Sequence, residues 1–479
     1  MSRLGRGALV LLAIAVLGGG LRWAAMRTLT PHSWVGDEVY YVWVAANIAN
    51  DNGHLYDGAT SLYSVALRPP AYSWLLSRFI DTKAPELRSN LQDSVRPLLL
   101  FQLTLGIILI LTTAALGHAL FGPRVGLLAA LGVAVYPTLI AHSHYFWSET
   151  LFSVLVTGAL TGIVRGERNP SPFLAAGTGL VFGVAALTRE IALPIAAASS
   201  LWWLARADLP DRRATLARAG LLLACATLVV LPWTIRNRSA LDRWIPVATI
   251  GWFAAAEGNA LDPDDWLHSD RRRMEFKNLY LRRGGEIERM DYARKQTLAA
   301  IRAEQPTWIF KKAIRNLALL LRPDSVLFQK LKAQSYRNVS LGVVRSLMTA
   351  AILSYVLVFV ACVLGVALAR ERGRRLLLLL VFATVGAVHL VANSTVRFRM
   401  PWMPLAIVYA SYAVLSARSA RRSLTRTSLA ASAAVWVFFF GVCVPHFRHE
   451  AQELWLHGVS PESAKAPTAS GQRERTRAP

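Results

Sequence analysis

The feature that most constrains this chain is a series of long apolar runs. A helix needs about 20 predominantly apolar residues to cross the hydrocarbon core of a bilayer. Backbone groups in lipid must be hydrogen-bonded within the chain, so such runs predict an all-α polytopic membrane protein. We expect about eleven transmembrane helices, near residues 7–25, 97–118, 125–141, 149–164, 173–188, 190–205, 216–234, 346–369, 376–392, 400–416 and 428–445.

Composition supports this class and argues against two others. Hydrophobic residues make up 54% of the 479 residues, more than the share of about 45–50% in soluble domains. The net charge of +24 is typical of nucleic-acid binders, but many of the arginines stand between apolar runs, where the bilayer accounts for them. We therefore expect membrane lipids, and no nucleic acid, as partners. Cys225, Cys362 and Cys443 lie inside apolar runs without metal-ligand or paired spacing.

The first residues allow two interpretations. Met1 to Arg6 followed by the run from Ala8 to Gly18 resembles a signal peptide. The alternative is a retained first span. The run continues through Leu21 and lacks a clear small-x-small cleavage site, which favours retention.

The arginines between the runs predict the orientation. If the amino terminus is cytoplasmic, the short inner connections are rich in arginine, as the positive-inside rule requires. Two long loops, 26–96 and 235–345, then lie on the outer face. We expect one transmembrane domain over residues 1–445 and a polar tail, 446–479, that composition predicts to be disordered from about Ser460.

The second outer loop is strongly basic. Between residues 286 and 322 its apolar side chains recur at near-helical spacing, which predicts amphipathic helices lying on the membrane. Most of its charges are expected to form a solvated face that favours anionic lipid.

The first outer loop contains two adjacent carboxylates, Asp37 and Glu38, close to the end of the first span. Ionisable groups at such a depth are costly and so mark functional candidates. The alternative is that both acids are solvated at the amino end of a helix. The neighbouring aromatic residues are of the kind that sit at the level of lipid headgroups: Trp34, Tyr40, Tyr41 and Trp43.

A second candidate in the same loop is Arg68. Pro69 and Pro70 follow it and stiffen the backbone, so the guanidinium can be held in one place. A guanidinium is suited to bidentate recognition of phosphate. The alternative is a stiff turn that starts the next helix, with Arg68 exposed.

Four further polar clusters stand at outer span ends. The histidines of His142–Glu149 with one glutamate make a weak case for a metal, so a divalent ion is possible but not indicated. Arg189 and Glu190 could form a simple loop or a local ion pair. Arginines at outer span ends oppose the positive-inside bias, so they indicate an anionic partner or snorkelling to headgroups: Arg236, Arg397 and Arg399.

An acidic pair with several arginines near lipid depth suits transfer of a sugar from a polyprenyl-phosphate donor. The phosphate is a good leaving group whose growing charge arginines can stabilise. The acceptor hydroxyl needs a carboxylate base. Such a site requires no cofactor.

The ordered series of these motifs resembles the GT-C glycosyltransferases, in particular the branch of protein O-mannosyltransferases and lipid A aminoarabinose transferases. The resemblance covers about residues 1–416 and implies a GT-C-like fold. It rests on Gly36-Asp37-Glu38-Val39-Tyr40-Tyr41, Arg68-Pro69-Pro70-Ala71-Tyr72, Ser148-Glu149-Thr150-Leu151-Phe152, Leu187-Thr188-Arg189, Pro232-Trp233-Thr234-Ile235-Arg236-Asn237, Gly258-Asn259 and Arg397-Phe398-Arg399-Met400-Pro401.

By this resemblance Asp37 is the catalytic base and Glu38 supports the site, while Arg68 meets the carrier phosphate. We assign three more arginines to that phosphate: Arg236, Arg397 and Arg399. We assign five residues to the substrates: Tyr41, Tyr72, Glu149, Arg189 and Asn259. The chain has Ala71 where the family motif has glycine, and it lacks the larger outer domains of the O-mannosyltransferases, which makes a protein the less expected acceptor.

The sequence thus predicts an inverting glycosyltransferase of the inner or plasma membrane, with its active site on the outer face. It would transfer a sugar from a polyprenyl-phosphate donor to a lipid or glycan, or less readily to a protein. The alternative is a transporter or flippase of a lipid-linked glycan, for which a base at Asp37 is unnecessary.

Overall fold

The regular elements of the protein are helices. The computed structural model describes residues 3–29, 36–57, 63–80, 96–206, 211–260, 270–323, 326–332, 336, 339–369, 371–416, 425–445 and 447. Across these ranges the only pairing of β type is one isolated antiparallel bridge between Tyr56 and Ser64. The all-α prediction is confirmed. Trp34 and almost all of the predicted polar tail lie outside the described residues.

Six described helices are long and apolar enough to cross a membrane. They are α1 (Arg3–Leu29), α5 (Arg96–Phe121), α11 (Arg212–Leu241), α17 (Leu341–Leu368), α18 (Arg372–Val391) and α20 (Arg426–Phe438), which a π-helical turn extends to Cys443. A bent pair, α6 (Pro123–Val135) and α7 (Pro137–Ala141), makes a possible seventh span with a bend of 61°.

The other predicted spans also coincide with helices, but the count of eleven is not confirmed. These helices are α8 (Glu149–Arg168), α9 (Pro172–Ala186), α10 (Ala192–Arg206) and α19 (Met403–Ser416). A helix of 15 residues, such as α9 or α10, is about 22 Å long. That is shorter than a hydrocarbon core of about 30 Å.

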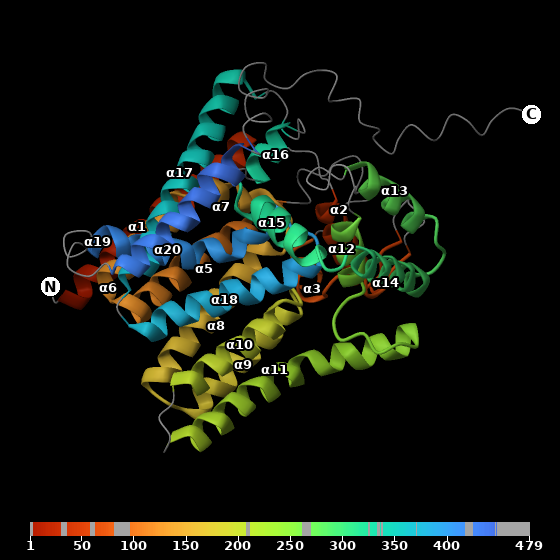
Figure 1. The fold of residues 1–479 in the computed structure, drawn as a ribbon, viewed down its shortest axis with the longest axis horizontal. Helices are drawn as coiled ribbons and strands as arrows, with labels where there is room; N and C mark the ends of the chain where they lie inside the picture. Colours follow the sequence, from red (N-terminus) through yellow and green to blue (C-terminus); the bar gives the residue numbers. More distant parts are fainter. Residues whose placement is uncertain are drawn as a thin grey trace, which may run out of the picture.

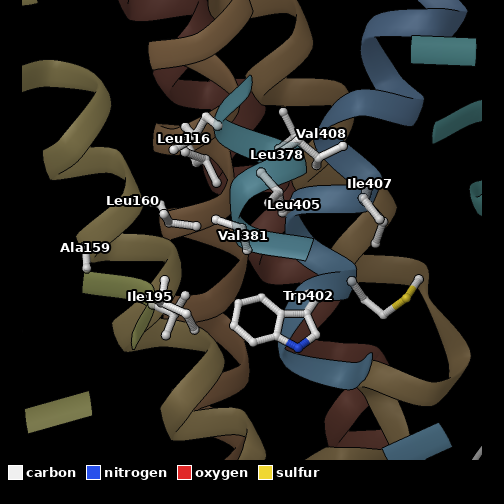
Figure 2. Packing of buried hydrophobic residues seen from close by; sticks show 14 of the residues in the cluster. Leu116, Ala159, Leu160, Ile195, Leu378, Val381, Trp402, Leu405, Ile407 and Val408 are labelled. Carbon is white, nitrogen blue, oxygen red and sulfur yellow. The ribbon is translucent and has the colours of Figure 1, made fainter. Parts of the chain in front are cut away.

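One hydrophobic core joins the bundle. Figure 2 shows side chains from five helices and one 3-10 turn, Val396–Trp402, meeting in it. The labelled residues come from α5, α8, α10, α18, the turn and α19: Leu116, Ala159, Leu160, Ile195, Leu378, Val381, Trp402, Leu405, Ile407 and Val408. Apolar residues of the short helices are therefore used for packing within the protein as well as for contact with lipid.

Arg22 in α1 is fully buried, and its side chain hydrogen-bonds to the backbone where α6 ends and α7 begins. Pro137 begins α7, so the last turn of α6 has carbonyls with no helical donor. The Arg22 guanidinium donates to the carbonyls of Val133 at 3.1 Å, Ala134 at 3.2 Å and Gly18 at 3.0 Å. The buried Arg22 side chain thus caps the last carbonyls of α6, at the bend between α6 and α7.

We expect Arg22→Met to destabilise the protein. The change leaves buried carbonyls without a donor, and each such group costs about 1–3 kcal/mol. Thermal unfolding in detergent should show a clear fall in Tm. Arg27, which is exposed on the same helix, gives the control Arg27→Met. An equal Tm for both variants would contradict the capping role.

The two predicted outer loops contain further helices, several of which lie together on the right-hand side of Figure 1. The first loop contributes α2 (Asp37–Ala49) and α3 (Ala71–Leu76). The second contributes α12 (Ile250–Asn259), α13 (Asp270–Leu281), α14 (Glu286–Ala303), α15 (Trp308–Leu321) and α16 (Val326–Lys332).

Helix α15 is amphipathic, but its polar side faces the protein. Lys312 and Asn316 are buried, whereas Phe310 is 71% exposed and Ile314 is 44% exposed. The Lys312 ammonium donates to the carbonyl of Gly258 at the end of α12. An apolar outer face of this kind fits the prediction of a helix in contact with lipid.

Candidate active site

The predicted acidic pair begins α2. Gly36 precedes it with φ 57° and ψ −113°, a conformation that only glycine adopts readily. Asp37 and Glu38 are consecutive in the helix, so their side chains leave it in different directions. The side chain of Asp37 remains 16% exposed, while that of Glu38 is fully buried. The two carboxylates therefore have different environments.

Asp37 is held between two arginines. The guanidinium of Arg68 binds one carboxylate oxygen, and Nη1 of Arg397 lies 2.5 Å from the other. Burial by itself would raise the pKa of Asp37, but Arg397 and Arg68 outweigh it and hold this pKa at about 2. Asp37 is thus an ionised, partly accessible carboxylate.

Arg397 bridges two carboxylates from distant parts of the chain. Besides Asp37 it binds Glu149, the first residue of α8, through Nε and through Nη2 at 3.1 Å. Its guanidinium lies 4.0 Å from the centroid of the Trp147 ring. Glu149 also accepts from Nη1 of Arg189 at 2.8 Å. Five of the predicted site residues, Asp37, Arg68, Glu149, Arg189 and Arg397, thus form one connected cluster.

Glu38 forms a buried ion pair that adjoins the cluster through the Trp147 ring. Its carboxylate binds the ammonium of Lys330 in α16 and accepts from the backbone N–H of Phe146 at 3.3 Å. Lys330 also lies over the rings of Tyr145 and Trp147, 5.2 and 5.3 Å from their centroids. Sequence reasoning missed Lys330, because it lies 292 positions from Glu38 in no recognisable motif.

Cations and carboxylates are close in number at this cluster. Within the described part of the chain, four cations share ion pairs with three carboxylates. The cations are Arg68, Arg189, Arg397 and Lys330, and the carboxylates are those of Asp37, Glu38 and Glu149. Glu190 follows Arg189 in the chain and interacts with its charge, so it adds a fourth carboxylate to the site.

Two predicted substrate residues form the aromatic support of the cluster. Tyr41 and Tyr72 pack edge to face with ring centroids 4.9 Å apart. The Tyr41 hydroxyl donates to Oγ of Ser148 at 3.2 Å. Arg68 lies 5.9 Å from the centroid of the Tyr41 ring. The rings limit where this guanidinium can lie.

Three other predicted residues are directed elsewhere. Arg236 donates to the carbonyl of Val65 at 2.8 Å, and Arg399 donates to the carbonyl of Leu320 at 3.1 Å. The amide of Asn259 donates to the carbonyl of Val391 at 2.7 Å, joining the ends of α12 and α18. Each of these three side chains thus binds a backbone carbonyl of another segment. A direct role for them with substrate stays a prediction.

The histidines of the 142–149 segment are used in packing. Nε2 of His144 lies 2.9 Å from the Tyr336 hydroxyl, and the His142 ring stacks edge to face against Tyr145. Among the described residues, no group of three or more histidine, cysteine, aspartate or glutamate side chains is placed to hold a metal ion.

A cavity of about 490 Å³ opens beside Arg68 and Arg189. Its polar lining includes these two guanidiniums and the side chains of Tyr41, Thr188, Glu190, His389 and Asn393. The remaining walls are mostly apolar, from α12, the end of α18 and the 3-10 turn: Ile250, Trp252, Ala254, Ala255, Val388, Val391, Ala392, Phe398, Pro401 and Trp402. The cavity suits a ligand with an anionic head and an apolar body.

Comparison with solved structures identifies the fold. The match to the archaeal oligosaccharyltransferase AglB from Archaeoglobus fulgidus, in complex with an inhibitory peptide and a dolichol-phosphate, has a TM-score of 0.53 and 15% identity over 94% of this chain. The same enzyme tethered to an acceptor peptide containing the NVT sequon gives 0.52 and 16% over 95%. The chain shares the fold of the membrane part of this archaeal oligosaccharyltransferase that it matches.

The likeness concerns the fold alone, and the predicted glycosyltransferase family and its branch stay predictions. The chain matches 56% of AglB, just over half of that enzyme. ArnT from Cupriavidus metallidurans bound to undecaprenyl phosphate matches with 14% identity over 86% of this chain and 78% of its own, but its TM-score of 0.38 is too low to add support. No protein-family model and no curated protein matches the sequence.

Proposed function

We propose that this protein is a membrane glycosyltransferase that transfers a sugar from a polyprenyl-phosphate donor to a lipid or glycan on the outer face of the membrane. The observation that carries the proposal is the placement of one ionised carboxylate, Asp37, between two arginines, one of which lines a largely apolar cavity. The fold that the chain shares with the archaeal oligosaccharyltransferase supports it.

The reaction follows from these contacts. Asp37 accepts the proton of the acceptor hydroxyl, and the acceptor oxygen attacks the anomeric carbon of the donor sugar. The bond between that carbon and the phosphate oxygen breaks, with inversion at the carbon. Arg68, with Arg397 and Arg189 beside it, stabilises the charge that the leaving phosphate gains. The Asp37 proton is released afterwards to solvent.

The arginines at the cavity favour an anionic donor. A phosphodiester between a sugar and a polyprenol carries a negative charge, which the guanidiniums of Arg68 and Arg189 can bind. Binding of this phosphate also draws Arg68 and Arg397 partly away from Asp37. The carboxylate then becomes a stronger base at the moment when the donor is in place.

The test is sugar transfer by purified protein in nanodiscs that contain a native lipid extract, with a panel of radiolabelled polyprenyl-phosphate sugars. We expect label in a new lipid or glycan product. Arg68→Ala should slow transfer by about 10²–10³-fold, the effect of removing one donor to a developing oxyanion. Arg78 is exposed just after α3, so Arg78→Ala is the control and should match wild type.

Two results would overturn the proposal. Equal transfer by wild type and Arg68→Ala would remove the phosphate assignment. Movement of intact labelled donor across sealed vesicles, with no new glycosidic bond, would establish transport instead.

A further inference from the structure

The segment that leads into Arg68 is held by the second outer loop. At the start of α14, Oε2 of Glu286 accepts from the backbone N–H of Val65 at 2.8 Å, and its two oxygens accept from the N–H of Ala66 at 3.3 Å. Oε1 also accepts from the hydroxyl of Thr249 at 2.7 Å. One side chain therefore ties residues 65–66 to the residue that precedes α12.

The carbonyls of the same segment are bound as well. The Arg289 guanidinium donates to the carbonyl of Tyr63 at 2.8 Å. The backbone N–H groups of Thr249 and Ile250 donate to the carbonyls of Ala66 at 2.9 Å and Leu67 at 3.2 Å. Partners from residues 236–289 thus hold the backbone as far as the residue before Arg68.

The backbone after Arg68 is fixed by different means. Pro69 and Pro70 restrict φ, and the N–H of Ala71 donates to the carbonyl of Leu187 at 2.9 Å. Among these contacts, charged side chains such as Glu286 hold the backbone before Arg68, whereas the backbone after Arg68 is held by the prolines and by a backbone hydrogen bond. Glu286 is 7% exposed, and a buried carboxylate is costly unless hydrogen bonds such as these compensate it.

We propose that Glu286 is a positioning residue for the donor phosphate: by binding residues 65–66 and Thr249 together, it fixes the Arg68 guanidinium relative to Asp37 and to the cavity wall formed by α12. The inference rests on the proposed function for the identity of the phosphate. The sequence alone does not reveal this role of Glu286. Glu286 lies 220 positions from Ala66, on a helix that was predicted only to lie on the membrane.

The contact geometry explains why a remote carboxylate affects the site. Arg68 and Pro69 form one wall of the cavity, and Ile250 and Gly251 form another. The Glu286 contacts join these walls. A displacement of about 1 Å at a charged group can cost about 10²-fold in rate. Loss of Glu286 should therefore weaken phosphate binding without touching the ligand.

The experiment compares Glu286→Ala and Glu286→Gln with Glu288→Ala. Glu288 is a neighbouring acid of α14 whose carboxylate accepts from the exposed N–H of Gly284 at 3.1 Å, which makes it a matched control. The first readout is hydrogen exchange at the amides of Val65 and Ala66, which requires no substrate. We expect faster exchange in Glu286→Ala, an intermediate rate in Glu286→Gln and the wild-type rate in Glu288→Ala.

The second readout is the affinity for undecaprenyl phosphate in nanodiscs, which requires no turnover. We expect Kd to rise about tenfold in Glu286→Ala and less in Glu286→Gln, in which one acceptor oxygen remains. The third readout is KM for the donor, which should rise in parallel with Kd. A merely structural role would lower the amount of folded protein and leave Kd and KM unchanged.

The outcomes separate this inference from the proposed function. Unchanged exchange at residues 65–66 in Glu286→Ala overturns it, and so does faster exchange with unchanged Kd. If wild type forms no product from any donor, the proposed function fails. In that case the hydrogen-exchange rates of Val65 and Ala66 and the Kd for undecaprenyl phosphate still test the positioning role of Glu286. If Glu286→Ala does not fold, Glu286→Gln supplies the same comparison.

Discussion

Asp37→Asn should abolish sugar transfer while leaving the donor bound. Asparagine has nearly the same shape as aspartate but cannot take a proton from the acceptor hydroxyl, and a positioned general base contributes about 10²–10⁴-fold to rate. Arg68 and Arg397 lose a carboxylate competitor, so the donor phosphate should bind at least as tightly as in wild type. The measurement is transfer from the donor panel, with donor Kd determined on the same preparation.

Asp51→Asn is the matched control for this substitution. Asp51 is exposed just after α2, and its positive φ of 60° is one that asparagine tolerates. This variant should retain wild-type transfer and Kd. If Asp37→Asn transferred sugar at the wild-type rate, Asp37 would not be the base. A parallel loss of donor binding would instead assign Asp37 to holding the arginines.

The two residues of greatest consequence were accessible from sequence for a simple physical reason. Asp37 is an ionisable group next to the end of the first predicted span, and Arg68 precedes Pro69 and Pro70, which restrict the backbone, so each local pattern indicates a candidate on its own. Their mutual contact was not predictable. It depends on how the first outer loop folds back, and the motifs are 31 positions apart.

Long-range contacts explain what the sequence missed. Lys330 and Glu286 bind groups 292 and 221 positions away, and neither stands in a motif that indicates a partner. Arg236 shows another side of this limit. Its position at a predicted span end suggested a phosphate ligand, which stays a prediction, and the structure adds that its guanidinium donates to the backbone carbonyl of Val65. Charge and location identified the region, but the direction of the side chain required the tertiary structure.

The number of spans shows a further limit. An apolar run indicates removal from water, but composition alone does not distinguish contact with lipid from contact with protein. Helix α8 illustrates this, because Phe152, Leu160 and Ile163 are buried within the bundle core while Glu149 at its start is buried in the candidate active site. Helices such as α8 satisfied the sequence criterion, and they make the prediction of about eleven spans exceed the number that length and composition support.

Arg397→Gln should damage both stability and activity. The change leaves Glu149, which is 1% exposed, and Asp37 without the cation that separates them. Breaking a buried ion pair by removing one partner costs about 3–5 kcal/mol. We expect a large fall in the free energy of unfolding in detergent. Arg243→Gln, which removes an exposed pair with Asp291 at 3.6 Å, should cost less than about 1 kcal/mol.

A second substitution distinguishes charge imbalance from loss of packing. In Arg397→Gln with Glu149→Gln, the uncompensated carboxylate is gone, so much of the lost stability should return while transfer stays impaired. Arg397→Lys keeps the charge without the planar fork that reaches both carboxylates, and should lie between wild type and Arg397→Gln. Equal stability of the single and double glutamine variants would show that the Arg397 side chain acts through packing against Trp147 instead.

The pH dependence of these variants tests the link between Arg397 and the base. With a pKa of about 2, below its unfolded value of about 3.9, Asp37 contributes stability that is present above pH ~4 and is lost as the pH falls through ~2. Wild-type transfer should therefore show no acidic limb from Asp37 between pH 5 and 8. In Arg397→Gln, Arg68 and Arg189 still oppose the effect of burial but the largest opposing charge is gone, so the pKa of Asp37 rises and protonation begins at a higher pH. The residual activity of this variant should fall more steeply than that of wild type on the acidic side. Profiles of the same shape would mean that Arg397 does not set the ionisation of the catalytic carboxylate.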